Sequence, residues 1–294
     1  MSQIVLILGR NGQVARELDK IGPPPGFALS FAGRERLDLA ARPDPGLLLN
    51  AELPAAVINA AGYTAVDKAE SEPEAAFRLN RDVPGDWSRA CAARDIPFVQ
   101  FSTDYVFDGS KPEPYLEDDP IAPASVYGLS KAGGEREVMA AGGRAAILRT
   151  SWVYSAFGAN FVKTTLRLAQ TRDELAVVDD QLGRPTWAED CARGALRLVQ
   201  ALLDRERGSS GVFHLSGAGD ATWADFAEAI FDESVGGPRP RVRRISTADY
   251  PAAAKRPANS RLDCNKILRT LDWPCRPWRE GLSACLMELE TQRG

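Results

Sequence analysis

Short apolar runs separated by longer amphipathic stretches dominate the first half of the chain and restrict its fold more than any other feature. Five runs have the character of strands: Ile4–Leu8, Ala28–Phe31, Ala55–Asn59, Phe98–Ser102 and Ala145–Leu148. They show little polar alternation, which is typical of strands in a sheet covered on both faces. Helical patterns lie between them, at Gln13–Lys20, Glu70–Arg94 and Tyr127–Ala141. This alternation predicts an α/β fold with a Rossmann-type, doubly wound parallel sheet, because parallel neighbours need helical crossovers.

The regular alternation weakens after about residue 155. Helices are expected there at Asn160–Gln170, Ala188–Leu203, Trp223–Glu233 and Trp278–Glu290, with short strands at Leu175–Val178 and Val212–Leu215. No internal repeat or low-complexity tract is found. We therefore expect two parts: residues 1–155, a nucleotide-binding Rossmann domain to which later segments can return, and residues 156–294, mainly a smaller α+β C-terminal cap.

Composition excludes several classes of function. The 294 residues are enough for about two domains. A net charge of -4 argues against a protein that binds nucleic acid by counterion release. The sequence contains no run of about 18 apolar residues, so we expect no membrane-spanning helix. The first residues lack the basic flank of a secretory signal, and five cysteines without a CxxC pair favour neither a disulfide framework nor a zinc site. His214 is the single histidine and is expected to be buried rather than a ligand, so we expect a cytoplasmic enzyme that uses Tyr, Lys, Ser, Thr or carboxylates.

A glycine turn directly follows the first apolar run. Gly9 and Gly12 stand in the spacing Gly-x-x-Gly-x-x-Ala, with Ala15 as the third small residue, and the turn opens the helix predicted at Gln13–Lys20. One glycine permits a tight turn, and a second lets the backbone approach a pyrophosphate held at the helix N-terminus. The spacing differs from the Gly-x-Gly-x-x-Gly of other dinucleotide-binding proteins, but its place in the first strand–turn–helix unit predicts dinucleotide binding.

The turn after the second predicted strand has arginines and no acid immediately at the strand end. An acid at this place binds the adenosine ribose in dinucleotide-binding sheets, whereas an arginine can pair with the 2′-phosphate of NADPH. Arg34 or Arg36 is therefore a candidate for recognising NADPH, although a solvated basic turn and the use of NADH are open alternatives. Asp38 and Leu39 could contact the adenine, and the small residues that begin the segment 60–64 suit the floor of a dinucleotide site.

A tyrosine and a lysine four residues apart form the candidate catalytic pair. Tyr127 and Lys131 share one face of a predicted helix, about one turn apart. An ammonium beside a phenol favours the phenolate and so allows proton exchange near neutral pH. Ser102 and Thr103 end a strand upstream, where open α/β sheets bind ligands, and could orient a carbonyl oxygen. Together these residues predict reduction of a carbonyl or oxidation of an alcohol.

The glycine turn, the strand-end Thr103 and the Tyr127–Lys131 pair together resemble the extended short-chain dehydrogenase/reductase superfamily. Longer stretches narrow the resemblance to the dTDP-4-dehydrorhamnose reductase family: residues 59–70 (NAAGYTAVDKAE), 102–107 (STDYVF), 149–154 (RTSWVY), 180–186 (DQLGRPT) and 256–262 (RPANSRL). These stretches span nearly the whole chain and are specific as a set.

The resemblance implies that NADPH or NADH reduces the 4-keto group of dTDP-4-dehydro-L-rhamnose to dTDP-L-rhamnose, which cells use in surface polysaccharide. It implies that Tyr127 donates the proton, that Lys131 binds the nicotinamide ribose, and that Thr103 hydrogen-bonds the reacting oxygen. The other cofactor-binding residues that the resemblance implies are Gly12, Gln13, Val14, Gly62, Tyr63 and Thr64. The turns described above complete the expected cofactor site with Gly9, Asn11, Arg34, Asp38, Leu39 and Ala61. The implied substrate-binding residues, in part on the cap, are Thr103, Asp104, Trp152, Asn160, Arg256 and Asn259.

The sequence departs from the family pattern in two places and leaves the metal open. Ala15 replaces the usual third glycine, and Gly62 stands where the family often has alanine. Some members dimerise through a magnesium ion held by glutamates. Glu17, Glu189 and Glu290 are the candidate ligands here, against the alternative that they are exposed surface acids. A homodimer is therefore left open.

Two other functions remain alternatives. A nucleotide-sugar epimerase or dehydratase would use the same fold and the same Tyr127–Lys131 pair. Dehydratases of this superfamily follow the threonine with Asp-Glu, whereas Tyr105 follows Asp104 here, which disfavours water elimination. A non-catalytic partner, similar to the regulatory subunit of methionine adenosyltransferase, is the second alternative. The presence of all three candidate catalytic side chains favours an enzyme.

Overall fold

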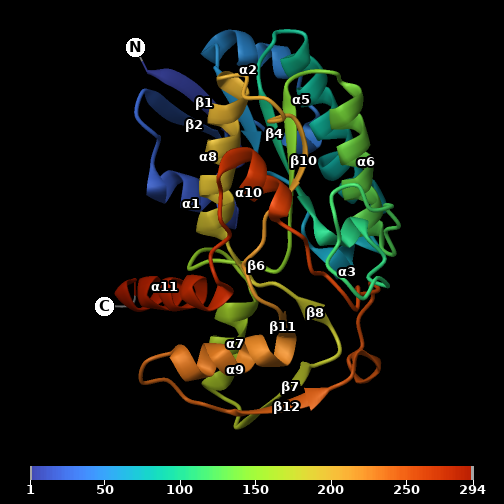
Figure 1. Ribbon diagram of the computed structural model, residues 1–294, viewed down its shortest axis with the longest axis vertical. Coiled ribbons are helices and arrows are strands. Elements are labelled where there is room, and N and C mark those ends of the chain that lie inside the picture. The colour runs from blue at the N-terminus through green and yellow to red at the C-terminus, as the bar shows by residue number, and fades with distance from the viewer. Residues whose placement is uncertain (1, 293–294) are drawn as a thin grey trace.

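A six-stranded parallel sheet forms the centre of the larger part of the molecule, as Figure 1 shows for the computed structural model, which describes residues 2–292. The strand order is β10-β5-β4-β3-β1-β2, and every neighbouring pair is parallel. The strands are β1 (Gln3–Leu8), β2 (Phe27–Ala32), β3 (Ala56–Asn59), β4 (Phe98–Thr103), β5 (Ala145–Thr150) and β10 (Gly211–His214). The predicted doubly wound parallel sheet is confirmed.

Helices cover both faces of this sheet, which explains why its strands are apolar throughout. Val5 and Ile7 of β1 belong to one core with α1 and α8, whereas Leu6 and Leu8 belong to a second core with α5 and α6. Successive side chains of a strand point to opposite faces, so both faces need apolar residues. The helices around the sheet are α1 (Gln13–Ile21), α8 (Ala188–Leu203) and α10 (Asn265–Leu271) on the first face and α2 (Pro45–Glu52), α5 (Val83–Ala92) and α6 (Val126–Ala140) on the second.

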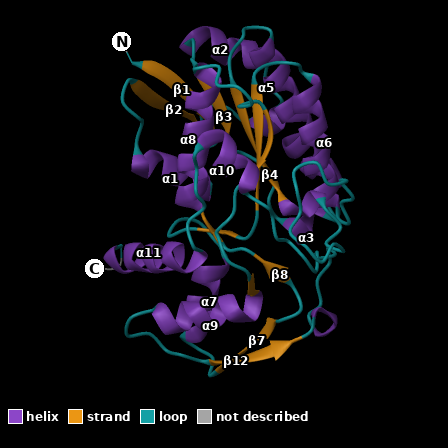
Figure 2. Cartoon of the chain, in the orientation of Figure 1, coloured by secondary structure: helices purple, strands orange, loops and turns teal. Residues whose placement is uncertain are grey.

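A smaller α+β part lies beyond the sheet, in the lower half of Figure 2. It has its own apolar core, to which Tyr154, Phe226, Trp278 and Leu282 contribute. Its main elements are α7 (Phe161–Ala169), β7 (Glu174–Val178), α9 (Trp223–Glu233), β12 (Arg241–Ile245) and α11 (Trp278–Thr291). The short pairs β6 (Val153–Tyr154) with β9 (Thr186–Trp187) and β8 (Leu182–Gly183) with β11 (Ala221–Thr222) lie where the two parts meet.

The helix expected at Glu70–Arg94 is present from Pro73 to Ala92, but a π-helical turn divides it into three parts. These are α4 (Pro73–Phe77), a π-helical turn η2 (Arg78–Asp82) and α5, with the short α3 (Val66–Ala69) before them. Pro84 has no backbone N–H, so it cannot donate to the carbonyl of Asn80 four residues earlier. The widened turn is placed where that regular hydrogen bond is missing, and π-helical turns are frequent at functional sites.

Besides the short pairs β6–β9 and β8–β11, three longer elements have no counterpart in the sequence expectations. They are α2, α10 and β12, and β12 pairs in parallel with β7. The sequence of β12, RVRRI, reads as a basic segment, but Arg243 pairs with Glu174 of the neighbouring strand at 2.9 Å. Cross-strand pairs of opposite charge stabilise exposed strands of this kind.

Segments from the second half of the chain return to the central sheet. β10 supplies its sixth strand, and α8 packs against α1 on one face. The division at residues 155 and 156 therefore stays a prediction, since much of the later chain belongs to the sheet. Within residues 2–292, no helix combines the length and apolar character needed to cross a membrane.

Candidate active site

The carboxyl ends of β1, β3, β4 and β5 meet at one edge of the sheet. Leu8 is paired with Asn59, and Thr103 is paired with Thr150, so the loops that follow these strands leave the sheet at the same level. β1 lies between β2 and β3, and the chain reverses its direction of winding there. Ligands of open α/β sheets bind in the crevice at such a reversal, which makes this edge the candidate active site.

The glycine turn after β1 presents open backbone to this crevice. Gly9 has φ +96°, and a Cβ there would lie 3.3 Å from the backbone nitrogen of Ala61, so only glycine fits the turn without strain. Gly12 is the N-cap of α1, and no side chain caps this helix end. The first N–H groups of a helix are unpaired and carry partial positive charge. The turn therefore fits the pyrophosphate of a dinucleotide.

The turn after β2 leaves one arginine available to a ligand. Arg36 pairs with the carboxylate of Glu52 and donates to the Ser30 hydroxyl at 3.1 Å. Arg34 is exposed and makes no ion pair among the described residues. The Asp38 carboxylate accepts a hydrogen bond from the Ala40 backbone and caps a short helical turn that begins at Leu39, a buried residue.

Asn80 joins the loop after β3 to α6, although no motif in the sequence pointed to it. Its amide group exchanges two hydrogen bonds with the backbone of Tyr63, at 2.8 and 2.9 Å, and donates to Ser130 at 2.9 Å. A Cβ on Gly62 would lie 3.0 Å from the Asn80 Oδ1, so glycine lets the loop close on this amide. Gly134 allows a still closer approach of α6 to the Asn80 carbonyl, which a Cβ would collide with. The π-helical turn thereby positions both elements.

Tyr127 and Thr103 lie together at the floor of the site. Both side chains are buried, and the Ser125 hydroxyl caps α6 just before Tyr127 by accepting from the Gly128 backbone at 3.2 Å. Burial raises the pKa of Tyr127, the Thr103 hydroxyl beside the phenol lowers it, and the Asp104 carboxylate raises it. The net shift is upward, so the phenol is protonated at neutral pH in the ligand-free protein. We expected the phenolate to be favoured, and burial reverses that expectation.

Lys131 lies one helical turn from Tyr127, as its spacing predicts, but its ammonium group is directed to the backbone. Its Nζ donates to the Phe101 carbonyl at 2.6 Å and would lie 3.9 Å from a Cβ on Gly62. Burial lowers the pKa of Lys131 to about 8, and the carboxylate of Glu135 opposes this shift. The ammonium group therefore lies between β4 and the loop expected to line the cofactor.

Two buried polar atoms near Tyr127 and Tyr105 have no close hydrogen-bond partner among the described residues, although the Ser260 hydroxyl faces the Asp104 carboxylate and Arg256 lies beside Tyr105. The two atoms are Oδ2 of Asp104 and Nη1 of Arg256. The Asp104 Oδ1 accepts from the Thr103 hydroxyl at 2.9 Å, and the other nitrogen of the Arg256 group donates to Asp67 at 2.6 Å. Buried polar groups are nearly always paired, so an unpaired acceptor and an unpaired donor indicate a polar ligand.

Trp152 provides an aromatic wall between the sheet and the smaller part. Its backbone is in the left-handed region with φ +49°, which a bulky residue adopts only where neighbours impose it. Its indole stacks on Trp223 with a centroid separation of 3.6 Å and an interplanar angle of 11°. A Cβ on Gly183 would collide with the same indole, so glycine makes room for it. The other face of Trp223 contacts Phe161 in the cap.

Two predicted substrate-binding residues have side chains that are already engaged. Asn160 donates to the Gln13 side chain at 2.9 Å and caps α7 through the Lys163 backbone. Asn259 donates to the backbone carbonyls of residues 111 and 113 and accepts from Arg261. Both therefore shape loops around the crevice, and their contact with a substrate stays a prediction.

Two of the three candidate magnesium ligands, Glu17 and Glu189, contact a lysine. The Lys20 ammonium lies 2.6 Å from Glu17, 2.9 Å from Glu189 and 2.7 Å from Glu288. Glu290, the third candidate, does not contact this lysine; its carboxylate accepts from the Val235 backbone at 3.3 Å. Because a cation of the protein itself already joins these carboxylates, the arrangement does not fit a magnesium ion. Residues 2–292 contain no group of three or more His, Cys, Asp or Glu side chains placed to hold a metal.

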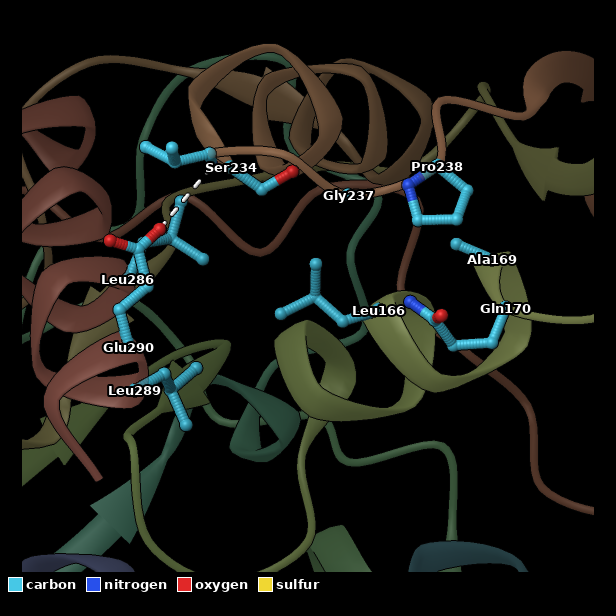
Figure 3. A pocket seen from close by; sticks show the side chains of 10 residues that line it. Leu166, Ala169, Gln170, Ser234, Gly237, Pro238, Leu286, Leu289 and Glu290 are labelled. Atoms are coloured by element: carbon cyan, nitrogen blue, oxygen red, sulfur yellow. Dashed lines mark hydrogen bonds between the residues drawn. The ribbon is translucent and has the colours of Figure 1, made fainter. Parts of the chain in front are cut away.

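A hollow in the smaller part lies away from the strand ends. Figure 3 shows it between α7, α11 and the loop that follows α9, with Leu166, Leu286 and Leu289 pointing into it. Its lining is mainly apolar and includes none of the residues expected to react. It is therefore a packing feature of the cap, not a part of the candidate active site.

A tyrosine, a lysine and a threonine at this edge of a doubly wound sheet define the short-chain dehydrogenase/reductase class of oxidoreductases. The family model described as RmlD substrate binding domain matches residues 2–291. A dTDP-4-dehydrorhamnose reductase of Sinorhizobium fredii is 46% identical over 278 residues, which are 94% of each chain. This chain belongs to the dTDP-4-dehydrorhamnose reductase family.

Solved structures agree with that membership. The dTDP-4-dehydrorhamnose reductase of Clostridium acetobutylicum superposes with a TM-score of 0.92 at 36% identity, covering 98% of this chain and 100% of that one. The reductase of Bacillus anthracis, solved in complex with NADP, superposes with a TM-score of 0.91 at 34% identity and the same coverage. The agreement extends over both the sheet and the cap.

We expect Asp104→Asn to stabilise the ligand-free protein at neutral pH. Burial raises the pKa of Asp104 to about 6, partly opposed by the hydroxyl groups of Ser260 and Thr103. Between its ordinary pKa of 3.8 and about 6, the folded chain binds a proton that the unfolded chain lacks. The free energy of unfolding therefore falls as pH rises through that interval. The substitution should add on the order of 2 kcal/mol at pH 7 and nothing near pH 4.

Urea denaturation of the variant and the wild type at pH 4, 5, 6 and 7 measures this difference. The exposed Asp118 offers the matched control, because Asp118→Asn should leave the pH dependence unchanged. A constant difference between Asp104→Asn and wild type across the four pH values would contradict the burial argument.

Proposed function

We propose that this protein reduces the 4-keto group of dTDP-4-dehydro-L-rhamnose with NADPH and releases dTDP-L-rhamnose. The observation that carries the proposal is the buried Thr103–Tyr127 pair beside the unpaired polar atoms of Asp104 and Arg256. Thr103 and Asp104 lie beside Tyr127, and Arg256 lies beside the adjacent Tyr105, so these groups are proposed to receive the carbonyl oxygen and its sugar. Membership of the reductase family supplies the substrate class.

The proton in this reaction comes from Tyr127. When bound, the reduced nicotinamide supplies a hydride to the C4 carbon, and the carbonyl oxygen then needs one proton to become a hydroxyl. Tyr127 holds that proton at neutral pH, because burial raises its pKa. The Thr103 hydroxyl lies beside the phenol and can orient the carbonyl oxygen toward it. A proton from solvent then restores the phenol, which completes the balance of one hydride and one proton per turnover.

Lys131 has two roles in this proposal. Its ammonium is placed between β4 and the Gly62 loop, where it can donate to the nicotinamide ribose. As a cation within one helical turn, it stabilises the phenolate that Tyr127 becomes when the proton leaves. The glycine turn at Gly9 and the open N-terminus of α1 at Gly12 would hold the pyrophosphate.

The sugar and its nucleotide are recognised by groups around this centre. Asp104 would accept from a sugar hydroxyl, and the unpaired donor of Arg256 suits an oxygen of the substrate. The indole of Trp152 would pack against the sugar ring. Binding of the remote nucleotide can then hold C4 in place, and such binding energy is expressed at the reacting centre.

The alternative dehydratase reaction lacks its characteristic glutamate, because Tyr105 occupies the position after Asp104. The Tyr105 ring packs edge-on against Tyr127 with centroids 5.4 Å apart. Burial raises the pKa of Tyr105, so this side chain is a poor base. Reduction needs only the proton donor Tyr127 at this site, whereas water elimination needs a further acid–base group, so we favour reduction.

We expect purified protein, NADPH and the 4-keto sugar nucleotide to give dTDP-L-rhamnose. Product analysis by NMR, together with loss of the reduced-nicotinamide absorbance, measures the reaction. A free 4-keto sugar without the nucleotide should react more slowly at saturation as well as bind more weakly. Appearance of a C4 epimer or of an eliminated product in place of dTDP-L-rhamnose would overturn the proposal.

Tyr127→Phe should lower kcat by about 100- to 10,000-fold, because it removes the proton donor and retains the ring. The phenol is buried against Tyr105, so phenylalanine keeps the packing. Binding of NADPH, measured by fluorescence titration, should change little. Near-normal turnover in this variant would show that another group supplies the proton.

Arg34→Ala should weaken NADPH binding by about tenfold or more while NADH binding stays nearly constant, since one charge-assisted contact to the 2′-phosphate is lost. Arg36→Ala is the matched control on the same turn, because Arg36 is already paired with Glu52. Titrations of both variants with both cofactors make the comparison. Equal losses for the two cofactors, or discrimination lost only in Arg36→Ala, would refute the assignment.

A further inference from the structure

A buried ion pair joins α6, the helix of Tyr127 and Lys131, to strand β5, and the proposed reaction makes no use of it. Glu135 and Arg149 are 4% and 2% exposed. The two carboxylate oxygens of Glu135 accept from the Arg149 Nε at 2.8 Å and from its Nη2 at 2.7 Å. Such a bidentate pair is rigid as well as strong. Burying two charges is costly, so a pair retained at this place calls for a specific role.

The pair connects α6 with the neighbouring strands β4 and β5. Glu135 follows Lys131 by one turn of α6, and its Oε1 also accepts from the Ser102 hydroxyl at 2.5 Å. Ser102 lies between Phe101, whose carbonyl accepts from Lys131, and Thr103. The expectation that Ser102 and Thr103 act together at the site is therefore revised, because the Ser102 hydroxyl is turned toward Glu135. One carboxylate thus joins α6, β4 and β5.

Arg149 is held from its other side as well. Its Nη1 donates to the Glu117 carbonyl at 3.2 Å and lies 3.3 Å from the His214 Nε2, and its guanidinium lies over the Phe107 ring. The His214 Nδ1 faces the Tyr115 carbonyl, which can only accept, so Nδ1 is the donor and Nε2 accepts from Arg149. Burial lowers the pKa of His214 to about 3, which keeps the ring neutral.

Few charged groups lie close enough to act on Lys131. On α6 itself Tyr127 and Glu135 each lie one turn from Lys131, while Arg136 and Glu137 lie further along the helix. On the elements packed against this part of α6 the ionisable groups are Asp104 of the turn after β4, Arg149 of β5, His214 of β10 behind Arg149, and the adjacent Arg81 and Asp82 of η2. Burial lowers the pKa of Lys131, and the negative charge of Glu135 acts in the opposite direction. A shift of that direction favours the ammonium form that the reaction needs.

We propose that Glu135 is a positioning residue for the reduction: through Ser102 and Arg149 it fixes Lys131 and Thr103 relative to each other, and its charge keeps Lys131 an ammonium ion. This inference rests on the proposed function. Glu135 touches neither the cofactor nor the substrate in this assignment. Its effect passes through the side chains and strands that it holds.

The test compares three variants on one enzyme. Glu135→Gln keeps the size and most of the hydrogen bonding but removes the charge. Ser102→Ala removes only the contact to β4. Glu137→Gln is the matched control, since Glu137 lies two residues further along the same helix, is exposed and pairs with Arg89. Circular dichroism and thermal denaturation first establish that each variant is folded.

Glu135→Gln should lower kcat by about 10- to 100-fold while the KM for the sugar nucleotide changes little, because misplacement of a catalytic group lowers turnover. Without the nearby negative charge, Lys131 should lose its proton at lower pH. The alkaline fall of the kcat–pH profile should therefore move down by about one pH unit. Ser102→Ala should lower kcat less and leave the alkaline fall in place, and Glu137→Gln should change neither.

A merely structural role predicts a different result. It would lower the melting temperature and the active fraction of Glu135→Gln without moving the alkaline fall, and that outcome overturns the proposal. If Glu135→Gln does not fold, Ser102→Ala decides the positioning argument, and an unchanged kcat in that variant overturns it.

A second readout separates this proposal from the proposed function. Fluorescence titration with NADPH across pH 6 to 10 follows the ionisation of Lys131 without any sugar nucleotide. Affinity should fall at lower pH in Glu135→Gln than in the wild type or Glu137→Gln. If the wild type fails to make dTDP-L-rhamnose but this shift is present, the function is wrong and the role of Glu135 stands. If dTDP-L-rhamnose forms but the shift is absent, the proposed function stands and the role of Glu135 is wrong.

Discussion

Parallel pairing of β1, β3, β4 and β5 in one register is the constraint on which the rest of this molecule depends. Because the strands run in the same direction, Gly9, Ala61, Thr103 and the segment after Thr150 all emerge at one edge. Residues far apart in the chain are brought together there by hydrogen bonds between backbones. Only small local contacts are then needed to complete the site, such as the close approach of Gly62 in the loop after β3 to the Asn80 side chain.

The elements that the sequence predicts well are those with a strong apolar period and a clear beginning. The helices at Ala188–Leu203 and Trp223–Glu233 are confirmed at both ends. The second begins with a capping box formed by Thr222 and Asp225, a signal visible in the sequence. The segment from Glu70 to Arg94 shows the limit of the same reasoning. Its apolar pattern continues through Pro84, but the hydrogen bond that proline lacks creates a π-helical turn.

The site was predictable where a motif places a reactive group and unpredictable where tertiary contacts decide its state. The spacing of Tyr127 and Lys131 indicates a shared helix face, and both are buried on it. Their protonation could not be read from the spacing, because burial by other segments raises the pKa of the phenol. Glu135 had one signal in the sequence that was not used. Arg149 is a charged residue in an apolar strand, and a buried arginine requires a buried acid.

The position of β10 in the sheet has a consequence for how the chain folds during synthesis. This strand is formed by residues 211–214, whereas its neighbour β5 ends at Thr150. Until residue 214 is available, β5 presents an unpaired edge composed largely of apolar residues, flanked by a face that α8 has yet to cover. Such edges template association with other chains. The nascent protein is thus exposed to misassembly through a long interval of translation, and pairing across a large sequence separation makes closure of the sheet a slow step.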